Sequence, residues 1–329
     1  MILKSNKNAI CFIPQFAELI LANSGASIPS IDFFFSRARH HKVSELEIDQ
    51  ALIQSNNLSQ SQLIDSHAAL SLRGFTEQYK EKWICHATPI LLQPNRQHIT
   101  LNNYFPSGDD VLFKKLFTTL NEYFVEDGLL FFEENKSWYC RSESKFPTSR
   151  YKPQDILGQN IIHKLPKDKE DQKWKKIFNE TQMVINQFNQ ASTNTELLVV
   201  NGIWYWGGGY LPQGITKAKN VVISNDIALK GFANMAGCPF YNIDEDINQL
   251  IINSSDSFLL QLIFIVNNNI LNQIDNIVES FLQMLKRKKI DQILFYPNME
   301  SRYVVGSSDM KKFWKKIKPA NSIIKRASI

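Results

Sequence analysis

Between residues 197 and 320, stretches typical of strands alternate with stretches typical of helices, and this alternation constrains the fold more than any other feature of the sequence. Strands are expected at Leu197–Trp206, Asn220–Ser224, Phe258–Val266 and Ile290–Tyr296, and helices at Asp226–Met235, Ile270–Lys288 and Asp309–Ile317. Parallel strands need crossover connections, so the alternation favours a helix-covered sheet. The sequence therefore predicts an α/β core with a parallel or mixed sheet.

Residues 81–150 follow another pattern and are expected to form a smaller, inserted α+β module. Strand-like segments, a helical stretch at Asp109–Phe124 and a hairpin turning at Glu134–Lys136 succeed one another. Residues 1–80 look mostly helical after a short strand at Ala9–Ile13, and a long amphipathic helix is expected from Asp171 to about Phe188. The expected division is a helical part at 1–80 packed on the core, a module at 81–150 and the core at 151–329.

The apolar runs and the cysteines of the sequence argue against a membrane protein and against a cysteine-based metal site. The longest apolar stretch, Phe258–Val266, is interrupted by Gln261 and is far shorter than the ~20 residues of a membrane helix. No signal peptide is evident. The four cysteines are far apart in the sequence and form no CxxC pair, which is typical of reduced thiols. We therefore expect a cytoplasmic protein with no membrane segment, no metal site and no cofactor.

The strongest local motif is the run from Asn201 to Pro212, NGIWYWGGGYLP. The glycines Gly207, Gly208 and Gly209 follow a strand directly, where they let the backbone approach a ligand, and their amides can form an anion-binding concavity. Trp204 and Trp206 can wall such a site. The alternative is that the glycines make a tight turn and the tryptophans fill the core. The spacing matches neither GxGxxG nor GxxxxGKS, so it does not support nucleotide binding of those kinds.

A second signal is Asp226, which ends a strand and opens the next helix, with Lys230 one turn later. Ligands of parallel sheets gather at the carboxyl ends of strands, so both residues are candidate polar contacts. The alternative is that Asn225 or Asp226 only caps the helix.

These motifs carry a resemblance to known families. The run Asn201–Gly209 and the segment Asp226–Gly237 resemble consecutive stretches of archaeal-type cofactor-independent phosphoglycerate mutases. Over roughly residues 80–320 the chain is also similar to the RpfE-type regulatory proteins of proteobacteria. The landmarks of that second resemblance are Trp83–Pro89, Leu120–Phe124, Asp127–Gly128, Trp138–Tyr139, Trp174, Asn179–Met183, the WYWGGGYLP run and Lys312–Lys316.

The resemblance implies a reduced alkaline-phosphatase-like core. In such enzymes a Ser or Thr nucleophile lies beside two divalent metals held by Asp and His residues, mostly in the C-terminal part. Here none of the six histidines lies after His163, and Tyr296–Met299 stands where an Asp-His pair is expected. The sequence therefore offers no metal ligands and no convincing catalytic residue, although a triad that draws on His86 or His163 stays open.

Three hypotheses follow, in this order. The first is a non-catalytic regulatory or binding protein on a mutase-like scaffold, which takes a phosphorylated metabolite or a protein partner near the Trp-Gly run. Its site would be walled by Asn201, Trp204, Trp206, Gly207, Gly208 and Gly209, with Asp226 and Lys230 as polar contacts. The second is a divergent phosphoglycerate mutase or phosphohydrolase. The third is a nucleic-acid-associated factor that uses Arg287 and the lysines around Trp314, since basic runs can contact phosphates.

Overall fold

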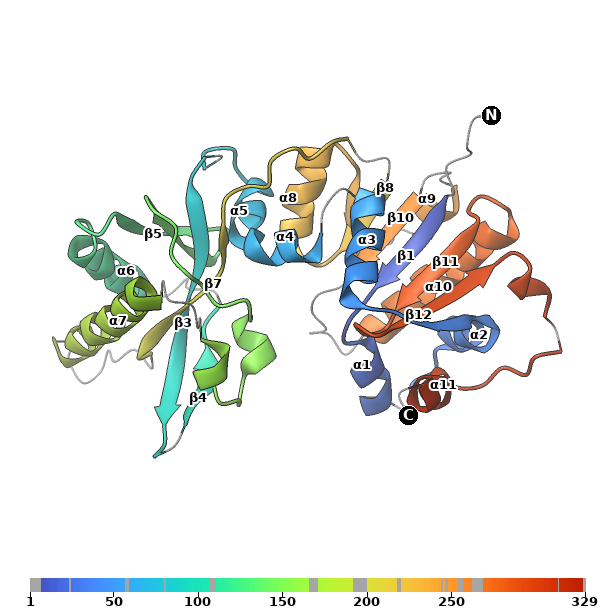
Figure 1. Cartoon of the computed structure of the whole chain (residues 1–329), viewed down its shortest axis with the longest axis horizontal. Coiled ribbons are helices and arrows are strands. Elements are labelled where there is room, and N and C mark those ends of the chain that lie inside the picture. The colour runs from blue at the N-terminus through green and yellow to red at the C-terminus, as the bar shows by residue number, and fades with distance from the viewer. Residues whose placement is uncertain are drawn as a thin grey trace. The chain divides into compact units, whose positions relative to one another are not determined.

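The computed structural model describes residues 7–23, 25–56, 59–79, 81–96, 98–106, 111–165, 171–191, 200–217, 220–243, 245, 248–253, 257–261, 269–312 and 314–327. The chain divides into two compact units (Figure 1). The first unit consists of Met1–Ser59 and Ile215–Ile329. The second, Gln60–Gly214, is inserted between those two segments, and we call it the inserted unit.

These boundaries differ from the expected division at residues 80 and 150. The first strand of the chain, β1 (Asn8–Phe12), pairs with two strands of the C-terminal half, so the N-terminal residues belong to the core sheet. The Trp-Gly strand β7 (Gly202–Gly209) pairs instead with β3 (Trp83–Pro94), so residues after 150 extend the inserted unit. Pairing between strands that are distant in sequence therefore sets both boundaries.

The described residues of the first unit form a seven-stranded mixed sheet, which confirms the expected fold class. Its strand order is β2-β12-β11-β1-β10-β8-β9, with parallel pairing from β11 to β9 and antiparallel pairing at β12 and β2. Besides β1, the strands are β2 (Arg39–Lys42), β8 (Asn220–Ser224), β9 (Phe240–Asn242), β10 (Ser257–Gln261), β11 (Gln292–Tyr296) and β12 (Ser301–Gly306).

Helices cover both faces of this sheet. Along β1, Ala9 and Cys11 face a core built with α1, α2 and α10, whereas Ile10 and Phe12 face α3 on the other side. This two-residue alternation is what a sheet buried on both faces requires. The helices are α1 (Phe16–Ala22), α2 (Pro29–Arg37), α3 (Glu45–Asn56), α8 (Ile227–Ala236), α9 (Asn248–Asn253), α10 (Ile270–Lys286) and α11 (Ala320–Ala327).

The last helix was misplaced by the sequence analysis. In the stretch expected to be helical, Asp309–Ile317, the described residues form a short 3-10 turn at Asp309–Lys311, and the helix begins at Ala320. The Lys315 carbonyl oxygen and the Lys318 amide instead bond with the side chains of Arg37 and Ser36 in α2, so these backbone groups are used outside a helix. The other part of the expected strand Phe258–Val266, residues 262–266, lies outside the described residues.

The inserted unit contains an antiparallel sheet of order β4-β3-β6-β5, with β7 along β3. Helices α6 and α7 pack on one face, and α5 packs on the other through Ala68 and Leu72. Asn135 and Lys136 have φ of 47° and 60°, as the expected hairpin turn requires. The remaining elements are α4 (Gln60–Asp65), α5 (His67–Arg73), β4 (Ile99–Tyr104), α6 (Val111–Tyr123), β5 (Leu129–Glu134), β6 (Ser137–Ser142), 3-10 turns at Pro153–Ile156 and Ile162–Lys164, and α7 (Asp171–Ala191).

No helix in the described parts of the chain has both the length and the apolar character needed to cross a membrane.

Candidate functional site

The two tryptophans of the motif lie in the core of the inserted unit. Trp204 is fully buried, and its indole N–H donates to the carbonyl oxygen of Tyr151 at 2.9 Å. Trp206 is 8% exposed, and its indole N–H donates to Oγ1 of Thr88 at 2.9 Å. Both indoles therefore have protein partners, as the core-filling alternative expects.

Just before β7 begins, the side chain of Asn201 forms hydrogen bonds with the backbone of β3. Its Nδ2 donates to the carbonyl oxygen of Leu92, and its Oδ1 accepts from the Leu92 amide, each at 2.7 Å. An amide side chain offers both a donor and an acceptor, so it copies the two hydrogen bonds of a backbone pair. These contacts give Asn201 a structural role at the start of the strand.

The three glycines lie in strand β7 and pass close to neighbouring residues, rather than forming a ligand-binding loop. Gly207 has a φ of 60°, which side chains rarely adopt, and a Cβ there would lie 3.0 Å from Cβ of His67. A Cβ at Gly208 would lie 2.6 Å from the ring of Trp83. Two of the amides are already used, since Gly207 donates to the carbonyl oxygen of Ser149 at 3.2 Å and Gly208 to Oγ1 of Thr148 at 3.1 Å.

A buried basic cluster lies against Trp206. Nδ1 of His67 is 2.9 Å from Nε2 of His86, and Nζ of Lys152 is 3.0 Å from Nε2 of His67. An ammonium group has only donors, so Lys152 in that form donates to His67, which then donates through Nδ1 to His86. The His86 ring stacks on Trp206 at a centroid distance of 4.0 Å, so His86 is packed against the core.

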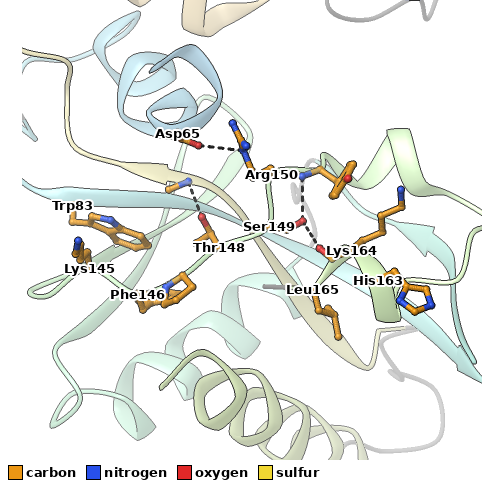
Figure 2. A pocket seen from close by; sticks show the side chains of 13 residues that line it. Asp65, Trp83, Lys145, Phe146, Thr148, Ser149, Arg150, His163, Lys164 and Leu165 are labelled. Carbon is orange, nitrogen blue, oxygen red and sulfur yellow. Dashed lines mark hydrogen bonds and ion pairs between the residues drawn. The ribbon is translucent and has the colours of Figure 1, made fainter. Parts of the chain in front are cut away.

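A pocket of about 540 Å3 opens beside Gly208, and Figure 2 shows the side chains that line it. We call it the cationic pocket. Its positive side chains come from the loop after β6 and from the 3-10 turn at Ile162–Lys164. The lining residues are Asp65, Trp83, Lys145, Phe146, Pro147, Thr148, Ser149, Arg150, Tyr151, His163, Lys164, Leu165 and Gly208.

The lining of the cationic pocket favours an anion. Lys145, Arg150 and Lys164 are basic side chains, and among the described residues of the lining Asp65 is the one acid. Nε of Arg150 is 3.6 Å from Oδ1 of Asp65, but both side chains are more than half exposed, so the pair is weak and open to competition. Clefts lined by one sign of charge concentrate ligands of the other sign.

Hydrogen bonds of Ser149 hold the wall of the cationic pocket beside the Trp-Gly strand, β7. Ser149 donates its amide to the carbonyl oxygen of Tyr205 at 2.9 Å and its hydroxyl to the carbonyl oxygen of Lys164 at 3.1 Å. One residue therefore ties both cationic segments to β7, and Figure 2 draws its hydrogen bond to Lys164. Of the six motif residues predicted as a site wall, Gly208 lines this pocket.

Asp226 and Lys230 belong to the first unit, so they share no described geometry with the other predicted residues. Oδ1 of Asp226 accepts from the Ala228 amide at 2.7 Å and caps α8, and Gly237 ends the helix with a φ of 63°. The capping alternative therefore accounts for Asp226. The role of both residues in ligand binding stays a prediction.

The two metals that the resemblance implies do not fit the residues in place. In the described ranges, no three His, Cys, Asp or Glu side chains lie close enough together to hold an ion. His40 instead lies 3.2 Å from the hydroxyl of Ser301 and contacts the Tyr303 ring in a tilted arrangement, with the ring centroids 4.8 Å apart. We derive no reaction step through a metal.

Sequence reasoning missed the cationic side chains of the pocket. The sequence does carry a signal, because residues 141–164 include Arg141, Lys145, Arg150, Lys152, His163 and Lys164. These residues have no common spacing, and the hydrogen bond from the Ser149 hydroxyl to the Lys164 carbonyl oxygen joins their two segments.

No protein-family model matches the chain, and no curated protein matches it. Among solved structures, the PH0037 protein from Pyrococcus horikoshii has a TM-score of 0.52 at 10% identity, covering 97% of this chain and 92% of that chain. A cofactor-independent phosphoglycerate mutase from Thermoplasma acidophilum has a TM-score of 0.43 at 10% identity, covering 97% of this chain and 95% of that chain. The first of these likenesses shows that the chain shares an α/β fold with the Pyrococcus protein over nearly its whole length.

Proposed function

We propose that this protein binds a small phosphorylated metabolite in the cationic pocket and does not convert it. The observation that carries the proposal is the excess of Lys145, Arg150 and Lys164 over Asp65 in a pocket of about 540 Å3. That volume is typical of small-molecule sites. Trp83, Phe146 and Leu165 supply an apolar surface for the carbon part of such a ligand.

Phosphate suits the donors of this pocket. A guanidinium group such as that of Arg150 matches a phosphate with two parallel hydrogen bonds, and a lysine adds a point charge. Oγ1 of Thr148 already accepts from the Gly208 amide, so its own hydrogen can be donated to a ligand. Displacing Asp65 from Arg150 costs little because that pair is exposed.

Support for binding without turnover comes from the hydrogen bonds of the Ser149 hydroxyl. A hydroxyl nucleophile needs a base or a metal beside it. The Ser149 hydroxyl instead donates to a backbone carbonyl oxygen, and its oxygen accepts from the Tyr151 amide at 3.1 Å. On the mutase-like scaffold that the resemblance implies, this pocket would keep ligand recognition without the chemistry.

The test is thermal unfolding of the whole chain with inorganic phosphate, 3-phosphoglycerate and other phosphorylated metabolites, each with and without Mn²⁺. A ligand at 100 times its Kd stabilises by about 2.7 kcal/mol, which is a shift of several degrees. We expect a shift that does not need Mn²⁺ and is lost in the double variant Arg150→Ala, Lys164→Ala. The matched control is Lys114→Ala, Lys175→Ala, which removes two cations from the helices α6 and α7.

Two results would contradict the proposal. A shift that survives in the pocket variant would place the ligand elsewhere. A shift that requires Mn²⁺, together with turnover of 3-phosphoglycerate, would establish the second hypothesis, a divergent mutase.

A further inference from the structure

Two basic runs adjoin the same end of two paired strands in the first unit. Residues 286–289 read Lys-Arg-Lys-Lys, and residues 311–318 contain five lysines and no acid. The first run leads into β11 at Gln292, and the second follows β12, which ends at Gly306. These two strands are antiparallel and Gln292 pairs with Gly306, so the first run and the start of the second lie at the same edge of the first unit. From there the chain continues toward α11 (Figure 1).

The lysines of the second run are largely without acidic partners. Asp309 is buried and pairs with Lys312 and, at 3.3 Å, with Arg39. Among the described residues, no acid lies within ion-pair distance of Lys311, Lys315, Lys316 or Lys318. Their charges therefore face solvent or a partner.

Backbone groups fix this segment to α2 and leave the lysine side chains outside. The Ser36 hydroxyl accepts from the Lys318 amide at 2.8 Å, and the Arg37 guanidinium donates to the Lys315 carbonyl oxygen. The Asp32 carboxylate accepts from the Ala320 amide at 2.7 Å. A segment held in this way presents its charges in a fixed arrangement.

Apolar surface lies among these charges. Trp314 is 67% exposed and Ile317 is 58% exposed. Beside them, a pocket of about 500 Å3 is lined by Phe35, Ser36, Ala38, Lys315, Lys316, Lys318 and Ile323. An exposed indole ring beside lysines suits a partner that is both anionic and able to stack.

We propose that this edge, residues 286–288 with 311–312 and 314–318, binds single-stranded nucleic acid. The lysines would contact successive phosphates, and a base would stack on Trp314. Sequence-tolerant binders of single strands combine these two elements, a basic track and aromatic platforms. A duplex offers the phosphates but keeps its bases stacked inside, so a single strand uses more of this surface. The surface lies in the first unit and is independent of the cationic pocket.

The test is fluorescence anisotropy of a labelled 20-mer of deoxythymidine with the whole chain at several salt concentrations. Each phosphate contact adds about −0.7 to the slope of log affinity against log salt, so four contacts predict a slope of about −3. The double variant Lys315→Ala, Lys316→Ala should weaken binding and bring the slope to about −1.5. Trp314→Ala should weaken binding about tenfold and leave the slope unchanged. The control Lys114→Ala, Lys175→Ala should bind like the unmodified protein.

Each of the following results would overturn the proposal. One is no binding at low salt. Another is binding that the control weakens as much as the Lys315, Lys316 variant. A third is full affinity in Trp314→Ala together with equal competition by polyglutamate, which would mark a site for any polyanion. A preference for anionic lipid vesicles over the oligonucleotide would assign the edge to a membrane surface.

Discussion

Gly209 passes so close to Asp65 that a Cβ atom on the glycine would lie 1.9 Å from the Asp65 carbonyl oxygen. Strand β7 thus runs directly against the junction of α4 and α5, where only hydrogen fits. The obstacle is backbone and cannot rotate away. The last glycine of the motif therefore has a packing reason that needs no ligand.

Gly209→Ala should lower the free energy of unfolding by about 3 kcal/mol, because the methyl group forces β7 away from α4. Gly208→Ala should cost less, since its nearest atoms belong to the side chains of Trp83 and Thr148. Gly25→Ala is the control, because nothing lies within 4 Å of the added carbon. Urea denaturation of the three variants checks the order, and equal stabilities would show that β7 does not make this approach.

Asn201 is expected to behave as a structural residue. Asn201→Ala leaves the amide and carbonyl of Leu92 without their side-chain partners and should cost about 2 kcal/mol. Asn201→Asp should cost more, because a carboxylate cannot donate to the Leu92 carbonyl oxygen. Asn121→Ala is a matched variant, since Asn121 makes the same pair of bonds to Phe131, at 2.6 and 2.9 Å. Urea midpoints would reveal the costs, and a stable Asn201→Ala with weakened ligand binding would assign Asn201 to a site instead.

The sequence predicts the periodic elements well and the functional surface poorly. The helix from Ile270 and the hairpin at Asn135 follow from local periodicity and turn chemistry, and the structure confirms them. The unit boundaries depend on β1 and β7, whose partners lie far away in sequence. Lys145 and Lys164 likewise belong to a basic stretch whose residues have no common spacing, so periodicity could not place them in one pocket.

For the Trp-Gly motif, the sequence predicts that the residues matter but does not decide between two roles. A run of glycines between tryptophans is typical both of a ligand loop and of a tightly packed strand. The two readings differ only in what lies opposite each glycine. Here Asp65, His67 and Trp83 lie opposite, and none of them is close to the motif in sequence.

Two substitutions at Trp206 distinguish a role in core packing from a role in ligand binding. Trp206→Ala removes the ring on which His86 stacks and should cost about 4 kcal/mol. Trp206→Phe keeps an aromatic ring, loses the hydrogen bond to Thr88 and should cost about 1–2 kcal/mol. Denaturation with and without inorganic phosphate measures both effects. We expect phosphate to stabilise Trp206→Phe as much as the unmodified chain, and loss of that stabilisation would place Trp206 in the binding site.

Asp309 should make the free energy of unfolding depend on pH in the acid range. Burial raises the pKa of Asp309, but the Lys312 hydrogen bond, the Gly306 amide and the Arg39 charge together hold it below its ordinary value. A carboxyl whose pKa is lower in the folded chain than in the unfolded chain stabilises the fold at pH values above its unfolded pKa, near 3.9. This stabilisation is lost as the pH falls through the folded pKa. Asp309→Asn should therefore cost about 2 kcal/mol at pH 7 and progressively less toward pH 3.

Asp275 provides the comparison of opposite sign. Burial raises the pKa of Asp275 and outweighs the amide hydrogen bonds from Ile31 and Ser30. A raised pKa means that its stabilising contribution is present at low pH and is lost as pH rises through the folded value. Compared with the unmodified chain, Asp275→Asn should therefore gain relative stability as pH rises from 3 to 7, whereas Asp309→Asn should lose it. Urea denaturation of both variants across that range gives the two slopes, and slopes of the same sign would contradict the electrostatic roles assigned to these carboxyls.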